Sequence, residues 1–146
     1  MTVNGRSVRV LFAGGGTGGH LFPGLAVAHE LRRRDPESKV MFAGTGLALE
    51  VQVLSREGIA LERVRAVGLA GGSPLTILKG LAHLPVAFFD AAGLLYRFRP
   101  DVVVGLGGYS SGPVVLLAAL SQIATLLMEQ NAVPGVTNRL LGWVVR

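Results

Sequence analysis

Residues 8–20 read VRVLFAGGGTGGH, and this stretch decides the fold. Its first six residues are apolar except for one arginine and stop at a run of glycines, which is typical of a buried strand in a parallel sheet. The glycines allow a sharp turn and a close approach of the backbone to a ligand. A helix is expected over 23–34, because Pro23 suits a first helical turn and the apolar residues that follow share one face.

The same order of elements recurs along the chain. Further strands are expected at 39–43, 61–67, 101–104 and 124–128, with helices over 47–57, over 75–98 with a break near Pro85, over 113–121, and from Pro134 or Thr137 to the last residue. This alternation predicts an α/β fold, a Rossmann-like parallel sheet with helices on both faces. Right-handed crossovers place all strand-to-helix loops at one edge of that sheet, where ligands bind.

Composition narrows the classes of function. The 146 residues suffice for one domain, half of them are apolar, and 14 Lys and Arg against 9 Asp and Glu give a net charge of +5. That charge favours anionic partners, but scarce aromatics and the lack of an arginine-rich run argue against nucleic acid. The absence of cysteine excludes a disulfide scaffold and a Cys-ligated metal site.

Two features bear on the membrane. The first residues lack the basic start and apolar run of a signal peptide, which makes the cytoplasm the default location. Residues 102–128 carry no charge and are long enough to span a bilayer, but glycines and a proline interrupt their middle. A buried strand, a loop and a buried helix are therefore expected there.

The first glycine loop, residues 14–19, is expected to bind an anion, most often a phosphate, because a helix N-terminus follows it. Its glycines match the dinucleotide pattern G-x-G-x-x-G, but the second strand ends without the acidic residue that binds the ribose. No lysine follows the glycines, as a Walker A loop requires. NAD and ATP are therefore both disfavoured.

Two more polar loops follow strands and are expected at the same edge. Residues 105–113, GLGGYSSGP, repeat the glycine pattern with hydroxyl groups added. Residues 128–131, MEQN, can orient sugar hydroxyls, and Glu129 can take a proton. His20 lies beside a positive helix end, which keeps an imidazole neutral as a general base must be, whereas His29 and His83 are expected to be structural or solvated.

Together these loops resemble the MurG family of bacterial transferases, glycosyltransferase family 28. The resemblance rests on GGTGGH at 15–20 with FPGLAVA at 22–28, GGY at 107–109 with SGP at 111–113, and EQN at 129–131 with Gly135 and Thr137-Asn138. It implies the N-terminal, acceptor-binding half of a GT-B enzyme over 1–146, with inverting chemistry and no metal or cofactor. That enzyme moves N-acetylglucosamine from UDP-N-acetylglucosamine to lipid I, the undecaprenyl-diphosphate-linked muramyl pentapeptide, and so makes lipid II for peptidoglycan.

The resemblance also implies the site. His20 and Glu129 are the expected catalytic residues, with His20 as the base for the acceptor hydroxyl. The two glycine loops are expected to hold the acceptor diphosphate. The expected substrate-binding residues are Gly15, Gly16, Thr17, Gly18, Gly19, Gly107, Gly108, Tyr109, Ser111 and Asn131.

Three departures from the family pattern stand out. Met128 replaces the usual histidine before Glu-Gln-Asn, and residues 70–73, AGGS, lack the usual basic residues. The donor-binding domain that would hold UDP-N-acetylglucosamine is absent, so the chain by itself is not expected to transfer sugar.

Residues 75–84, LTILKGLAHL, are apolar with cations nearby. They suit either peripheral binding to anionic lipid at the cytoplasmic face of the membrane or packing on the sheet. Two other functions stay open: a non-catalytic membrane-recruitment subunit that binds the acceptor for a split transferase and, with less support, a fragment of a Rossmann-type oxidoreductase.

Overall fold

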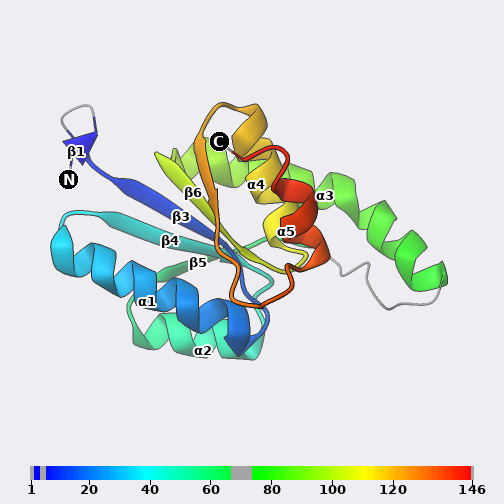
Figure 1. Cartoon of the computed structure of the whole chain (residues 1–146), viewed down its shortest axis with the longest axis horizontal. Coiled ribbons are helices and arrows are strands. Elements are labelled where there is room, and N and C mark those ends of the chain that lie inside the picture. The colour runs from blue at the N-terminus through cyan, green and yellow to red at the C-terminus, as the bar shows by residue number, and fades with distance from the viewer. Residues whose placement is uncertain (1, 4–5, 67–73, 146) are drawn as a thin grey trace.

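The computed structural model describes residues 2–3, 6–66 and 74–145, and the side chains of 2–3, 74–79 and 81 lie outside that description. Among these residues, five parallel strands form one sheet in the order β5-β4-β3-β6-β7 (Figure 1). A short antiparallel pair precedes it. The strands are β1 (Thr2–Val3), β2 (Arg6–Ser7), β3 (Arg9–Gly14), β4 (Lys39–Gly44), β5 (Ala60–Arg63), β6 (Val102–Gly107) and β7 (Ala124–Leu127).

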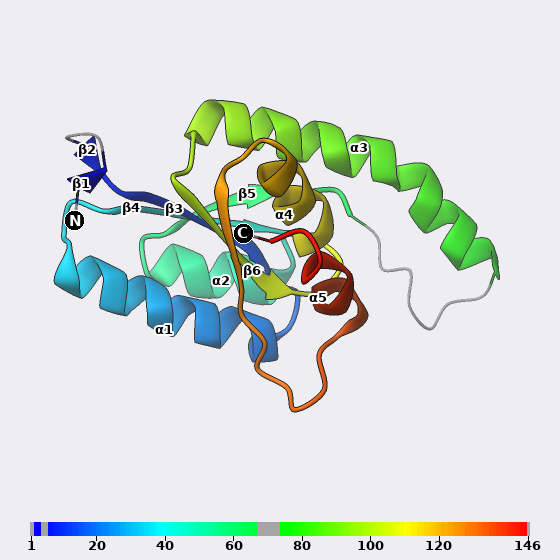
Figure 2. The same cartoon turned by 45° about the horizontal axis from the view of Figure 1, so that its top comes forward.

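Helices cover both faces of the five-stranded sheet (Figure 2). One face carries α1 (Gly18–Arg34) and α2 (Ala48–Arg56). The other face carries α3 (Pro74–Phe98) and α4 (Ser111–Leu120), and α5 (Val136–Leu141) packs beside α4. The predicted α/β class, with a parallel sheet covered on both faces, is confirmed.

Alternate residues of the central strand β3 face opposite layers. Leu11 and Ala13 belong to the core under α3 and α4, whereas Val10 and Phe12 belong to the core under α1 and α2. Phe12 stacks on Phe42 of β4 with 4.9 Å between the ring centroids. Because this strand is buried on both faces, its sequence is apolar at consecutive positions rather than at every second one.

The helices depart from the expected ones most clearly in three places. α1 begins at Gly18, five residues before the predicted start, with Pro23 inside it. α3 runs through Pro85 without the predicted break. A proline inside a helix removes one backbone hydrogen bond, and a helix that packs on a core tolerates that loss. The last helix, α5, ends at Leu141 instead of continuing to the last residue.

The charge-free stretch 102–128 divides into β6, α4 and β7, as expected. In the described part of the chain, no helix is both long and apolar enough to cross a bilayer. β6 extends through Gly107, so the first residues of the second glycine loop belong to the strand. β5 ends at Arg63, and the last residue of the strand predicted over 61–67 lies outside the described residues.

The strand order contains a topological switch point between β3 and β6. The chain leaves β3 for β4 on one side and later returns to add β6 on the other side. The crossovers therefore diverge from this pair of strands. In folds of this kind, ligands bind outside the carboxyl ends of such a pair. β3 ends at Gly14 and β6 at Gly107, so the predicted anion-binding loops both start at the carboxyl ends of this pair of strands.

Candidate functional site

Because α1 starts at Gly18, β6 ends at Gly107 and α4 starts at Ser111, the first glycine loop comprises residues 14–17 in the structure and the second comprises residues 107–110. The two loops are in direct contact. Gly14 has φ +122° and Gly107 has φ +95°, backbone conformations that side chains of L-residues rarely adopt. A Cβ atom added to Gly14 would collide with the carbonyl oxygen of Gly107. At Gly108 it would lie 3.5 Å from the carbonyl oxygen of Gly15. The expectation that these loops meet at one sheet edge is confirmed.

His20 lies in the first turn of α1 with its ring against the second glycine loop. Its Nδ1 is 3.1 Å from Oγ1 of Thr17, and its Nε2 is 3.1 Å from the position of a Cβ added to Gly107. Thr17 is the N-cap residue of α1, but its side chain contacts the ring instead of capping the helix. When Nδ1–H donates to Thr17, Nε2 is the nitrogen that can accept a proton.

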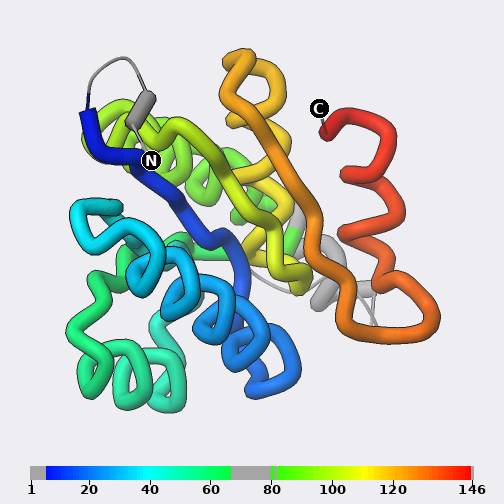
Figure 3. Tube along the Cα trace, turned by 60° about the vertical axis from the view of Figure 1, so that its left-hand side comes forward, coloured from blue at the N-terminus to red at the C-terminus, as the bar shows by residue number. Residues whose placement is uncertain are grey.

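The third loop (residues 128–135) connects β7 to α5, drawn in orange and red in Figure 3. Glu129 organises it. Its Oε1 accepts from the N–H and Nδ2 of Asn131, at 3.0 and 2.9 Å, and its Oε2 accepts from the N–H of Gly135 at 3.1 Å and Nδ2 of Asn138 at 3.0 Å. These hydrogen bonds, foremost that from the Asn131 N–H, lower the pKa of Glu129 to about 2. Such a carboxylate is a weak proton acceptor at neutral pH.

Asn138 joins the third loop to the second. Its side chain is buried, and Nδ2 also donates to the carbonyl oxygen of Met128 at 3.0 Å. The same nitrogen lies 3.5 Å from the position of a Cβ added to Gly107. His20 contacts that glycine too, so the three loops converge there. Asn138 was not among the predicted site residues, although it belongs to the motif that carried the resemblance.

The predicted substrate-binding residues differ in their exposure. Thr17, Gly19, Tyr109 and Asn131 are exposed, and Gly16, Gly18 and Gly108 are half-buried. The remaining three, Gly15, Gly107 and Ser111, are buried. The hydroxyl of Ser111 donates to the carbonyl oxygen of Gly108 at 2.8 Å, so it holds the second loop in shape.

Sequence reasoning also missed Glu50, in the first turn of α2. Its carboxylate is buried and accepts a hydrogen bond from the N–H of Gly16 at 2.8 Å, so it links the start of α2 to the first glycine loop. A glutamate three residues after the N-cap, here Leu47, can accept a hydrogen bond from the N-cap N–H, as Glu50 does. Nothing in that spacing, however, indicates a contact with a loop 34 residues earlier.

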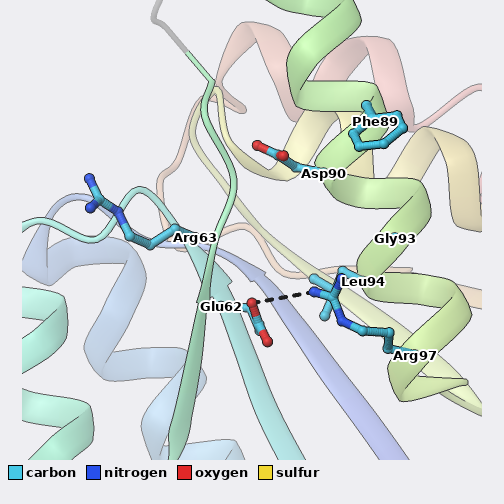
Figure 4. Close-up of a pocket in the computed structure, with 7 residues that line it drawn as sticks. All are labelled: Glu62, Arg63, Phe89, Asp90, Gly93, Leu94 and Arg97. Carbon is cyan, nitrogen blue, oxygen red and sulfur yellow. Dashed lines mark ion pairs between the residues drawn. The ribbon is translucent and has the colours of Figure 1, made fainter.

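A pocket between β5 and α3 contains none of the predicted site residues. Figure 4 shows its lining and the ion pair between Glu62 and Arg97, which is 3.5 Å long. Asp90 on α3 pairs with Arg65 at 2.7 Å, and that hydrogen-bonded guanidinium lowers the pKa of Asp90. These pairs attach α3 to the segment around β5. The lining residues are Glu62, Arg63, Phe89, Asp90, Gly93, Leu94 and Arg97.

The third loop is expected to loosen in acid. The pKa of Glu129 is about 2 in the folded chain against an ordinary 4.5, so its contribution to stability is complete above about pH 4.5 and is lost as the pH falls towards 2. Amide chemical shifts of Asn131 and Gly135, followed by NMR from neutral pH to below pH 2, should show this titration. The Glu129→Gln variant should lack it. A midpoint near 4.5 in the parent chain would contradict the assigned hydrogen bonds.

Comparisons with known proteins show the family of this chain. The model of the glycosyltransferase family 28 N-terminal domain matches residues 10–146. A Myxococcus xanthus protein named UDP-N-acetylglucosamine–N-acetylmuramyl-(pentapeptide) pyrophosphoryl-undecaprenol N-acetylglucosamine transferase is 52% identical over 139 residues, which are 95% of this chain and 36% of that protein. A Syntrophus aciditrophicus protein of the same name is 48% identical, over 93% of this chain and 38% of that protein.

Solved structures give the same result. The crystal structure of Acinetobacter baumannii MurG matches with a TM-score of 0.74 and 34% identity, over 95% of this chain and 40% of that one. The glycosyltransferase SnogD from Streptomyces nogalater, 23% identical with a TM-score of 0.64, supports the fold alone. The chain thus spans 36–40% of the length of the Myxococcus xanthus and Syntrophus aciditrophicus transferases and of Acinetobacter baumannii MurG. It belongs to glycosyltransferase family 28 and carries the N-terminal domain of that family.

Proposed function

We propose that this chain is the acceptor-binding half of an inverting hexosyltransferase that moves N-acetylglucosamine from UDP-N-acetylglucosamine to lipid I, giving lipid II. The observation that carries the proposal is the contact between the two glycine loops at the switch point, with the His20 ring against Gly107. The name of the Myxococcus xanthus relative describes this transfer. The donor would be held by the part of such relatives that this chain does not span.

The geometry supports a simple division of roles. The first turn of α1 presents N–H groups that lack partners inside the helix, together with its positive dipole end, to the acceptor diphosphate. His20 accepts the proton of the acceptor hydroxyl at Nε2 while that oxygen attacks the anomeric carbon of the donor sugar, and UDP leaves. Thr17 holds Nδ1 of the ring. Glu129 keeps Asn131 in place through two hydrogen bonds, so its main role is to position that contact.

The proposal includes peripheral binding at the cytoplasmic face of a bacterial membrane, because the acceptor is a lipid. The first part of α3 extends beyond the sheet in both Figure 1 and Figure 2. Farther along that helix, the side chains of Phe89 and Tyr96 are each 76% exposed. The stretch 75–84, which suggested membrane binding in the sequence, mostly has side chains outside the described residues.

A chimera tests this function. Residues 1–146 would replace the matching part of the Myxococcus xanthus relative, and the product would be assayed with lipid I in anionic phospholipid vesicles and labelled UDP-N-acetylglucosamine. We expect labelled lipid II, and we expect the chimera to sediment with the vesicles. A folded chimera that makes no lipid II would contradict the transferase proposal, and vesicle binding by that inactive chimera would favour the recruitment subunit instead.

A further inference from the structure

Glu50 forms a buried contact between α2 and the first glycine loop. Only 1% of the residue's surface is exposed. Its Oε1 accepts hydrogen bonds from the N–H groups of Gly16 at 2.8 Å and Thr45 at 3.3 Å. Its Oε2 accepts from the N–H of Leu47 at 2.8 Å and the hydroxyl of Thr45 at 3.0 Å. Four donors from two segments therefore surround one carboxylate.

Sterics at two glycines show how closely the backbone approaches this carboxylate. A Cβ atom added to Gly15, in the first glycine loop, would collide with Oε1 of Glu50, and so would one added to Gly44 at the end of β4. Gly15 also has φ +148°, within the region that favours glycine. The loop is thus shaped around Glu50 by both hydrogen bonding and close packing.

A direct chemical role for Glu50 does not fit this geometry. A catalytic acid or base must reach the reacting group, whereas this carboxylate is enclosed and both of its oxygens already accept hydrogen bonds. Burying a carboxylate is costly unless donors compensate for the lost water, and here backbone and hydroxyl donors do so. The contacts therefore indicate that Glu50 acts on the loop rather than on a ligand.

We propose that Glu50 is a positioning residue that holds the first glycine loop in the shape that binds a phosphate group. Its hydrogen bond occupies the N–H of Gly16, so the ligand is bound by other N–H groups at the start of α1. The identity of the ligand as a lipid-linked diphosphate rests on the proposed function. The effect of Glu50 on loop shape does not.

Glu50 could affect anion binding through its charge or through the position of the loop, and these two explanations make opposite predictions for Glu50→Gln. The variant keeps the side-chain size, removes a negative charge next to the first glycine loop, and places an NH₂ group against backbone N–H donors. If charge alone mattered, the variant would bind anions more tightly, because a like charge is lost. If Glu50 positions the loop, the variant binds anions more weakly.

Inorganic pyrophosphate, titrated into the ¹⁵N-labelled 146-residue chain, serves as the probe. We expect Glu50→Gln to weaken pyrophosphate binding by about tenfold and to speed exchange of the Gly16 amide by about tenfold or more, as loss of a charge-assisted hydrogen bond implies. Glu37→Gln removes the same charge from an exposed position and should change neither quantity. Thermal unfolding of each variant shows whether it is folded at the assay temperature.

Each result has a defined meaning. Equal or tighter pyrophosphate binding by Glu50→Gln would overturn the proposal. If the parent chain binds no pyrophosphate, the proposed anion site fails. Exchange of the Gly16 amide then decides the role of Glu50 by itself, and unchanged exchange in Glu50→Gln would overturn that role. If Glu50→Gln does not fold, Glu50→Asp, which keeps the charge but withdraws it by one methylene, is expected to speed Gly16 exchange without losing the fold, and unchanged exchange there would also overturn the proposal.

Discussion

Replacing His20 by alanine in the chimera is expected to lower kcat for lipid II formation by about 10²–10⁴-fold, the usual contribution of a positioned general base. The ring lies between Thr17, which contacts Nδ1, and Gly107, which faces Nε2. Alanine leaves no group there that can take the proton of the acceptor hydroxyl. Steady-state turnover with purified lipid I measures the loss.

His29 provides the matched control for this experiment. It lies on the same helix, is exposed, and pairs with Glu57 at 2.9 Å on the surface. His29→Ala should change kcat by less than about twofold, because the partner of this ring is Glu57 on the surface and not a residue of the glycine loops. If His20→Ala retained a turnover similar to that of the His29→Ala control, His20 would not be the base.

Gly14→Ala is expected to cost about 2–5 kcal/mol of unfolding free energy, which would threaten the folded state of a chain this small. The estimate combines about 1–2 kcal/mol for a side chain at positive φ with about 1–3 kcal/mol for forcing a methyl group into a packed contact. Gly14 has φ +122°, and its added Cβ would meet the carbonyl oxygen of Gly107, which belongs to the backbone and cannot move aside alone. Urea unfolding followed by circular dichroism gives the difference.

Gly58→Ala separates these two contributions. Gly58 lies two residues beyond the end of α2 with φ +61°, and a Cβ atom there would have nothing within 4 Å. Only the backbone conformation is penalised, so we expect a loss of about 1 kcal/mol. Equal losses at Gly14 and Gly58 would show that the two glycine loops are not in the close contact described above.

The sheet was predictable because its signal is local. β3 and β4 are apolar runs that end at glycines, and burial on both faces produces such runs regardless of what packs on them. The start of α1 was misplaced because proline is commonest in a first helical turn, and here Pro23 lies one turn farther in. α3 continues through Pro85, and its buried residues from Ala87 onward belong to the core shared with α4, a tertiary contact that no local pattern reports.

Only part of the candidate site could be predicted, because some of its contacts join segments that are distant in the sequence. The loops could be placed together because strand order and crossover handedness put them at one edge. Glu50 was missed because its role depends on a contact between the start of α2 and the first glycine loop, which exists only after folding. Glu129 was predicted to be catalytic from the resemblance, but its hydrogen bonds to Asn131 and Asn138, and hence its low pKa, follow from how the third loop turns back to α5.

The switch-point strands have a consequence for binding thermodynamics. β3 and β6 are buried almost throughout, and the glycine turns continue directly from their ends. Those turns lose most of their conformational entropy when the chain folds rather than when a ligand arrives. A phosphate group bound at the proposed site would meet a preorganised receptor, so little of its interaction energy would be consumed in ordering the protein.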